Sequence, residues 1–202
     1  MTSSPRALLA ALLLLLPTAP AVLVAASAAP AGAAPASVAG RAWDAPPEDY
    51  AAYDPQRRCR REALPGTVEL ARWFARQGGR LGGLVRGCRV GGTSEHKDGR
   101  AFDWHVDARV RADRRLVADV LDRLTAPDRA GNEDALARRM GVMYVIWDDR
   151  LWSAWDGFEP EPYLSGSCRR VTRCSPTLRH RDHVHVSLSR AGARGLTSWY
   201  AR

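Results

Sequence analysis

The chain has 202 residues, and its 30 lysines and arginines outnumber its 22 acidic residues, which gives a formal net charge of +8 at pH 7. This length suits one domain with appendages, because a single hydrophobic core commonly takes about 100–200 residues. A nucleic-acid-binding protein can carry such a charge, but these arginines are scattered and no aromatic-interleaved recognition motif accompanies them. We therefore expect no nucleic acid partner.

Residues 1–28 have the pattern of a secretory signal peptide. Arg6 supplies a positive charge, residues 7–16 form a continuous apolar run, and residues 26–28 read Ala-Ser-Ala, a small-residue cleavage site. A transmembrane anchor is the alternative, but Pro17 interrupts the apolar stretch and no stop-transfer segment follows it. We expect export without a stable membrane anchor. Loss of Arg6 lowers the net charge of the mature chain to +7.

Residues 29–49 are rich in Ala and Pro and lack an apolar period, which predicts a disordered spacer before a domain over residues 50–202. Outside a cell the abundant polyanion is the envelope itself. The charge of the mature chain therefore favours adhesion to an anionic cell-envelope surface, with a merely solvated arginine-rich surface as the alternative. We expect a secreted or cell-wall-associated protein, and a monomer.

Four cysteines in an exported chain predict two disulfides. Cys168 and Cys174 bracket a short polar loop, and Cys59 and Cys88 bracket the first helical segment. This pairing is the preferred one, although four cysteines allow three connectivities. A zinc–thiolate site is disfavoured because no Cys-x-x-Cys spacing occurs.

The first predicted helix covers residues 67–77. Its apolar residues recur at helical spacing, with Pro-Gly before it and Gly-Gly after it. Residues 99–107 alternate instead, which predicts a strand. We expect the side with Phe102 and Trp104 to face the core, and the side with Asp103 and His105 to face a cleft.

A second amphipathic helix is predicted over residues 114–124, with Asp113 as its N-cap. Asn132 is expected to cap a further short helix that ends at Gly141. Residues 142–148, VMYVIWD, then predict a buried strand, which an Asp-Asp-Arg turn sends back through Leu151 and Trp152.

Residues 155–167 are aromatic and punctuated by Gly and Pro, which predicts a long irregular loop. Trp155 and Tyr163 are candidates for substrate contact. Ordinary aromatic anchors of the loop are the alternative interpretation of both residues.

Two stretches carry the chemistry. Residues 94–103 read SEHKDGRAFD, with His96 and Asp103 separated by a turn, and residues 179–188 read RHRDHVHVSL, with His183 and His185 on one face of a strand-like run. The first stretch and one histidine of the second form an N/O ligand set for Zn²⁺. Three protein ligands leave a fourth tetrahedral position for water, the pattern of a catalytic zinc.

In sequence, these two stretches resemble the D-alanyl-D-alanine carboxypeptidase (VanY-like) family of zinc peptidases. That family belongs to a wider group with the lysostaphin-like enzymes and the hedgehog-type domain. Its pattern is Ser-x-His, then Gly-x-Ala-x-Asp, then a late carboxylate-x-x-His, and all three parts occur here in order. The resemblance covers roughly residue 53 to the C-terminus. It implies an α+β fold with a small, mainly antiparallel sheet that carries the site and helices packed on one face.

The resemblance also assigns roles. His96, Asp103 and His185 take the zinc-ligand positions, and Asp182 takes the general-base position, which is usually glutamate in the family. His183 is then expected beside the metal, where it would stabilise the tetrahedral intermediate or donate to it. An upstream arginine polarises the scissile carbonyl in the family, and the GLVRGC segment offers Arg86, with a plain surface charge as the alternative.

Two other histidines stay open. His105 competes with the family's ligands, and the role of His180 is open, with a rim position preferred.

The resemblance implies a zinc metallopeptidase that hydrolyses peptide bonds in peptidoglycan stem peptides. D-Ala-D-Ala carboxypeptidase and endopeptidase action share this chemistry, so the bond cleaved stays open. The alternative is a non-catalytic, zinc-containing wall-binding module on the same fold, and the aspartate at position 182 leaves it open.

Overall fold

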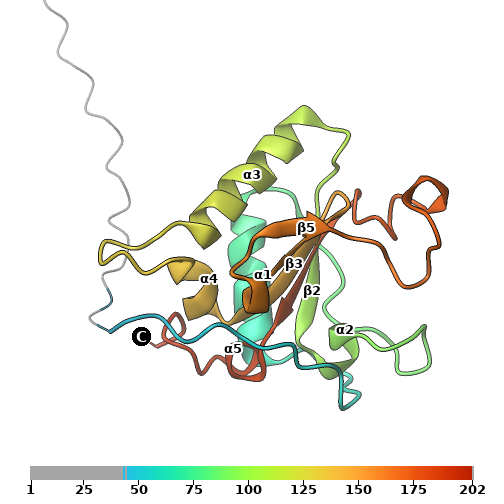
Figure 1. Cartoon of the computed structure of the whole chain (residues 1–202). Coiled ribbons are helices and arrows are strands. Elements are labelled where there is room, and N and C mark those ends of the chain that lie inside the picture. The colour runs from blue at the N-terminus through green and yellow to red at the C-terminus, as the bar shows by residue number, and fades with distance from the viewer. Residues whose placement is uncertain (1–42, 44, 202) are drawn as a thin grey trace, which may run out of the picture. The chain divides into compact units, whose positions relative to one another are not determined.

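The computed structural model describes residue 43 and residues 45–201 (Figure 1). The predicted signal peptide, residues 1–28, and most of the predicted spacer, residues 29–49, lie outside the described residues. Within the spacer range, the Trp43 indole N–H donates to the Ser198 carbonyl, and the Ser198 hydroxyl donates to the Glu48 carboxylate. Contacts with the domain therefore begin before residue 50.

The described part is an α+β domain built on one six-stranded sheet. The strand order is β1-β2-β6-β3-β4-β5, and every neighbouring pair is antiparallel, as predicted. The strands are β1 (Arg80–Leu81), β2 (Ala101–His105), β3 (Val142–Trp147), β4 (Arg150–Ser153), β5 (Pro160–Pro162) and β6 (Val184–Leu188). The helices are α1 (Pro65–Gln77), α2 (Glu95–Asp98), α3 (Arg111–Thr125), α4 (Ala135–Met140) and α5 (Arg190–Arg194), with 3-10 turns at Ala154–Asp156 and Val171–Arg173.

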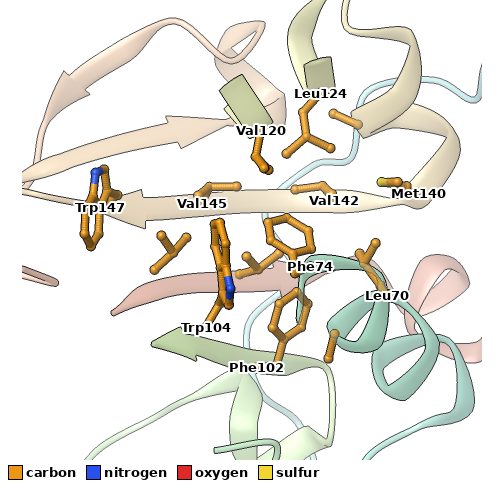
Figure 2. Packing of buried hydrophobic residues seen from close by; sticks show 14 of the residues in the cluster. Leu70, Phe74, Phe102, Trp104, Val120, Leu124, Met140, Val142, Val145 and Trp147 are labelled. Carbon is orange, nitrogen blue, oxygen red and sulfur yellow. The ribbon is translucent and has the colours of Figure 1, made fainter. Parts of the chain in front are cut away.

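The hydrophobic core lies between one face of the sheet and helices α1 and α3 (Figure 2). Phe74 of α1 packs edge-on against Phe102 and Trp104 of β2, with ring centroids 5.1 Å and 5.4 Å away. Leu124 of α3 is buried in the same cluster. Burying each such side chain contributes roughly 1.5–3 kcal/mol, so this face fixes how the sheet sits on the helices.

The strand register sends the polar side chains of the central strands to the opposite face. Phe102 pairs with Val186 and Asp103 pairs with His185, and successive residues of a strand point to opposite faces. The predicted alternation of β2 is confirmed, because Phe102 and Trp104 are fully buried while Asp103 is half-buried. A one-residue slip would move the aromatic rings out of the core, so packing fixes the Asp103–His185 pairing.

Both predicted helix caps are wrong. Helix α3 begins at Arg111, and Asp113 lies in its first turn, where its carboxylate accepts the backbone N–H of Asp107. The Asn132 amide contacts the Asp128 carboxylate, and Asp134 is the N-cap of α4. In both cases a short polar side chain bonds to a preceding turn, which competes with capping.

The long loop predicted over residues 155–167 also needs correction. It contains strand β5, which pairs with β4 through Leu151 and Glu161, and it begins within a 3-10 turn. The predicted strand over residues 142–148 and its return through residues 151–152 are confirmed as β3 and β4.

The predicted disulfide pairing is confirmed. Cys59 bonds to Cys88 and Cys168 bonds to Cys174. Two disulfides are typical of proteins in oxidising, extracellular environments. Among the described residues, none of the helices combines the length and apolar character that crossing a bilayer requires.

Candidate metal centre

Three donor atoms from three elements converge on the polar face of the sheet. His96 lies in α2, Asp103 in β2 and His185 in β6. His96 Nε2 is 3.1 Å from Asp103 Oδ1 and 3.1 Å from His185 Nδ1, and Asp103 Oδ1 is 3.3 Å from His185 Nδ1. The atoms form a nearly equilateral triangle, and this group can hold a metal ion.

The triangle fits a small tetrahedral cation. Ligands about 2.0–2.1 Å from a tetrahedral ion stand roughly 3.3–3.4 Å apart, close to the spacing of these three atoms. His96 is 1% exposed and His185 is 6% exposed, but the Asp103 side chain keeps 20% of its surface exposed. The group is thus buried on the histidine side and open to solvent beside the carboxylate.

Local backbone geometry brings His96 back towards Asp103. Gly99 ends α2 in the left-handed region at φ 70°, and a Cβ there would stand 2.6 Å from the Glu62 carbonyl oxygen. Glycine is therefore required at this turn. The carboxylate of Asp98 accepts the backbone N–H groups of Arg57 and Arg58, which ties α2 to the segment before α1.

The protonation states favour metal binding. Burial alone would raise the pKa of Asp103, but its hydrogen bonds with His185 and His96 outweigh burial and hold that pKa well below its usual value. Burial lowers the pKa of His185, although Asp103 opposes this effect. At neutral pH the site therefore offers an ionised carboxylate and a neutral His185, the forms that bind metal.

Ser187 contacts the ring nitrogen of His185 that lies away from the other two donor atoms. The His185 Nε2 atom is 2.9 Å from Ser187 Oγ, and Ser187 is fully buried. An Nε2–H that donates to Ser187 leaves the Nδ1 lone pair facing His96 and Asp103. Such an outer partner orients a ligating imidazole.

Asp182 and His183 flank the triangle as a bonded pair. His183 Nδ1 is 2.8 Å from Asp182 Oδ1, and His183 Nε2 is 3.7 Å from Asp103 Oδ1. The other Asp182 oxygen accepts the Thr177 hydroxyl at 2.6 Å. Burial raises the pKa of Asp182, but the bonds from Thr177 and His183 outweigh it and lower that pKa. His183 thus stands between Asp182 and the triangle.

The other predicted site residues differ in where they lie. Arg86 is exposed, and within residues 43 and 45–201 it makes no hydrogen bond or ion pair with the metal-binding group. His105 is exposed, with its ring 6.3 Å from that of His183, and lies outside the group. His180 is half-buried, with its ring 4.8 Å from that of His183, rather than at an exposed rim. Burial first, then the charges of His185 and His183, lower the pKa of His180 to about 2.

Sequence reasoning named Trp155 but missed Tyr144, and the two form an aromatic wall beside His185. The Tyr144 ring stacks on His185 with centroids 5.5 Å apart, and its hydroxyl donates to the buried Glu95 carboxylate at 2.7 Å. Trp155 packs edge-on against Tyr144. The signal available was parity: Tyr144 shares the strand face of Ile146, which pairs with His185. Tyr163, the other loop aromatic, contacts the ring of His180.

Comparison with known proteins identifies the family. The family model described as the VldE C-terminal domain matches residues 57–168, more than half of the chain. The chain belongs to the VldE C-terminal domain family. The part matched by the VldE model includes His96 and Asp103 and ends before Asp182, His183 and His185. Neither the curated proteins nor the solved structures contain a significant match to the chain.

Proposed function

We propose that the protein is an exported zinc metallopeptidase that hydrolyses peptide bonds in peptidoglycan stem peptides. The observation that carries the proposal is the triangle of His96, Asp103 and His185 donor atoms with the Asp182–His183 pair beside it. Two nitrogens and one oxygen at tetrahedral spacing suit Zn²⁺, and three protein ligands leave one position open. The VanY-like sequence pattern supports the same reaction.

Zinc bound at this site would supply Lewis acidity that brings the pKa of a water towards about 7. The protein must then accept the water's proton. We assign that step to His183 Nε2, which faces the triangle, because both oxygens of Asp182 are already engaged by His183 and Thr177. Asp182, which takes the general-base position of the VanY-like pattern, would accept the His183 Nδ1–H and stabilise the imidazolium.

The water O–H bond breaks, its proton moves to His183 Nε2, and the oxygen bonds to the peptide carbonyl carbon. His183 then returns the proton to the amine nitrogen as the C–N bond breaks. Arg86 is exposed, so we give it no part in these steps.

We further propose that the Tyr144–Trp155 wall contacts the substrate. Both rings lie on the His185 side of the group, and Trp155 is 43% exposed. An exposed aromatic next to a half-buried one offers apolar area at low entropic cost to a peptide or sugar. The basic surface favours an anionic cell envelope as the place of action.

The proposal is tested by mass spectrometry of purified peptidoglycan after incubation with the mature protein. Loss of a terminal D-alanine, or a new stem-peptide fragment, should disappear with a chelator and return with zinc. His183→Ala should abolish the product while zinc stays bound, and His105→Ala, which removes an exposed histidine outside the group, should keep it. Folded, zinc-loaded protein that yields no product would contradict the proposal and favour the wall-binding module.

A further inference from the structure

A hollow away from the metal centre is lined by six arginines together with Leu64 and Asp98. Its volume is about 390 Å³, and none of the metal-binding side chains lines it. The segment before α1 runs beside α2 and α5 at the lower side of the domain (Figure 1), and all three contribute residues to the lining of the hollow. Its cationic lining consists of Arg57, Arg58, Arg60, Arg100, Arg190 and Arg194. We call this hollow the arginine pocket.

The walls of the arginine pocket are held in place by backbone contacts. The Arg57 and Arg58 N–H groups donate to the buried Asp98 carboxylate at 3.1 Å and 2.8 Å. The Arg60 N–H donates to the Lys97 carbonyl at 2.7 Å, and the adjacent Cys59 is disulfide-bonded. The backbone that presents these arginines is therefore fixed before any ligand arrives, which lowers the cost of binding.

Half of the guanidinium groups are engaged within the protein. Arg100 is 1% exposed and donates to Asp98 and to the carbonyls of Leu188 and Asp54. Arg190 pairs with the carboxylates of Asp54 and Asp98. Arg57 pairs with Asp54 as well, although its side chain is 70% exposed. Asp54 and Asp98 are thus shared among these three arginines, and they form no ion pair with the other arginines of the pocket.

The remaining three arginines are available to a ligand. Arg58, Arg60 and Arg194 are exposed, and among the residues that the structure describes none of them has a carboxylate partner. Arg194 lies one helical turn after Arg190 on α5, so both line the same side of the pocket. Guanidinium groups bind phosphate through paired N–H donors, and several around one hollow suit an anion with many oxygens.

We propose that the arginine pocket binds phosphate groups of a polyanion, independently of the metal centre. Phosphate fits because its oxygens accept the paired N–H donors of a guanidinium group. A polyanion also brings several phosphate charges to the three arginines that have no carboxylate partner among the described residues. The site would anchor the protein on a phosphate-bearing surface and leave the metal-binding group free.

Calorimetric titration of the whole mature protein with inorganic pyrophosphate tests the pocket. We expect one bound pyrophosphate, with the same affinity before and after chelator treatment, since no metal-binding side chain takes part. The double variant Arg58→Gln/Arg194→Gln should bind about tenfold more weakly or worse, because it loses charge-assisted hydrogen bonds. The matched variant Arg115→Gln/Arg129→Gln, which removes two exposed arginines elsewhere, should bind like the wild type.

Equal weakening in both double variants would mean that only net charge matters and would overturn the pocket, as would the absence of a bound pyrophosphate. Loss of binding on chelation would overturn its independence from metal. Sedimentation with phosphatidylglycerol vesicles and binding to soluble poly(glycerol phosphate) then distinguish a lipid headgroup from a phosphodiester polymer. The source is the one whose binding the pocket variant loses, and a pocket variant that retains both overturns the proposal. Peptidoglycan hydrolysis by that variant should be unchanged, so either proposal can fail alone.

Discussion

Replacing Ser187 with alanine should weaken metal binding without unfolding the domain. His185 Nε2 and Ser187 Oγ are 2.9 Å apart, and Ser187 is fully buried on β6. The variant leaves the imidazole N–H without an acceptor in a place that water does not reach. An unsatisfied buried donor costs about 1–3 kcal/mol, and losing an outer partner of a ligating histidine lowers metal affinity about 10- to 100-fold. The two ranges agree, because tenfold corresponds to about 1.4 kcal/mol.

The assay is a zinc titration in competition with a chromophoric chelator, at pH 7.5, with thermal melting as a check of folding. Ser153→Ala is the matched control. Ser153 is also fully buried in the sheet, but its hydroxyl has no hydrogen-bond partner within the described residues. It should bind zinc like the wild type. A Ser187→Ala protein with wild-type zinc affinity would refute the claim that Ser187 orients His185 for metal binding.

Three further predictions concern other parts of the domain. Replacing Cys59 and Cys88 with serine should lower the free energy of unfolding by about 3–4 kcal/mol, since the bond closes a loop with a sequence separation of 29; an unchanged melting temperature would contradict this. Asp182→Asn should retain zinc and lose most peptidase activity, and wild-type turnover would exclude Asp182 from the mechanism. In metal-free protein, stability to urea should fall as pH drops below about 6.5. Burial lowers the native-state pKa of His180 and His185, so in this pH range the unfolded chain binds protons at these histidines while the native state does not. The free energy of unfolding should then fall by up to about 1.4 kcal/mol per pH unit for each group. A flat profile between pH 7 and 5 would contradict that sign.

Local patterns predicted the elements that carry the site. The alternation over residues 99–107 correctly assigned the core face to Phe102 and the open face to Asp103, because one strand face must be buried. The disulfides followed from which segments the cysteines bracket. The helices α1 and α3 followed from apolar periodicity, which depends on burying one face and not on the exact cap.

The parts that could not be predicted depend on tertiary contacts. Asp103 and His185 are 82 residues apart, and their pairing follows from β6 lying between β2 and β3, which no local pattern specifies. Helix α2 has four residues, too few for a periodic signal. The two cap predictions were wrong because the side chains of Asp113 and Asn132 bond to the preceding turns, at the Asp107 backbone N–H and the Asp128 carboxylate. The engagement of Asp98 by the Arg57 and Arg58 backbone, which shapes the arginine pocket, likewise needs the folded chain.

The most direct test of the central claim is the zinc content of purified mature protein, measured with that of His96→Ala, His185→Ala and His105→Ala variants. Each melting curve establishes that the variant is folded. We predict one zinc per chain in the wild type and in His105→Ala, and none retained in the other two. Folded His96→Ala or His185→Ala protein that keeps a full equivalent of zinc would place the metal elsewhere and contradict the proposed centre.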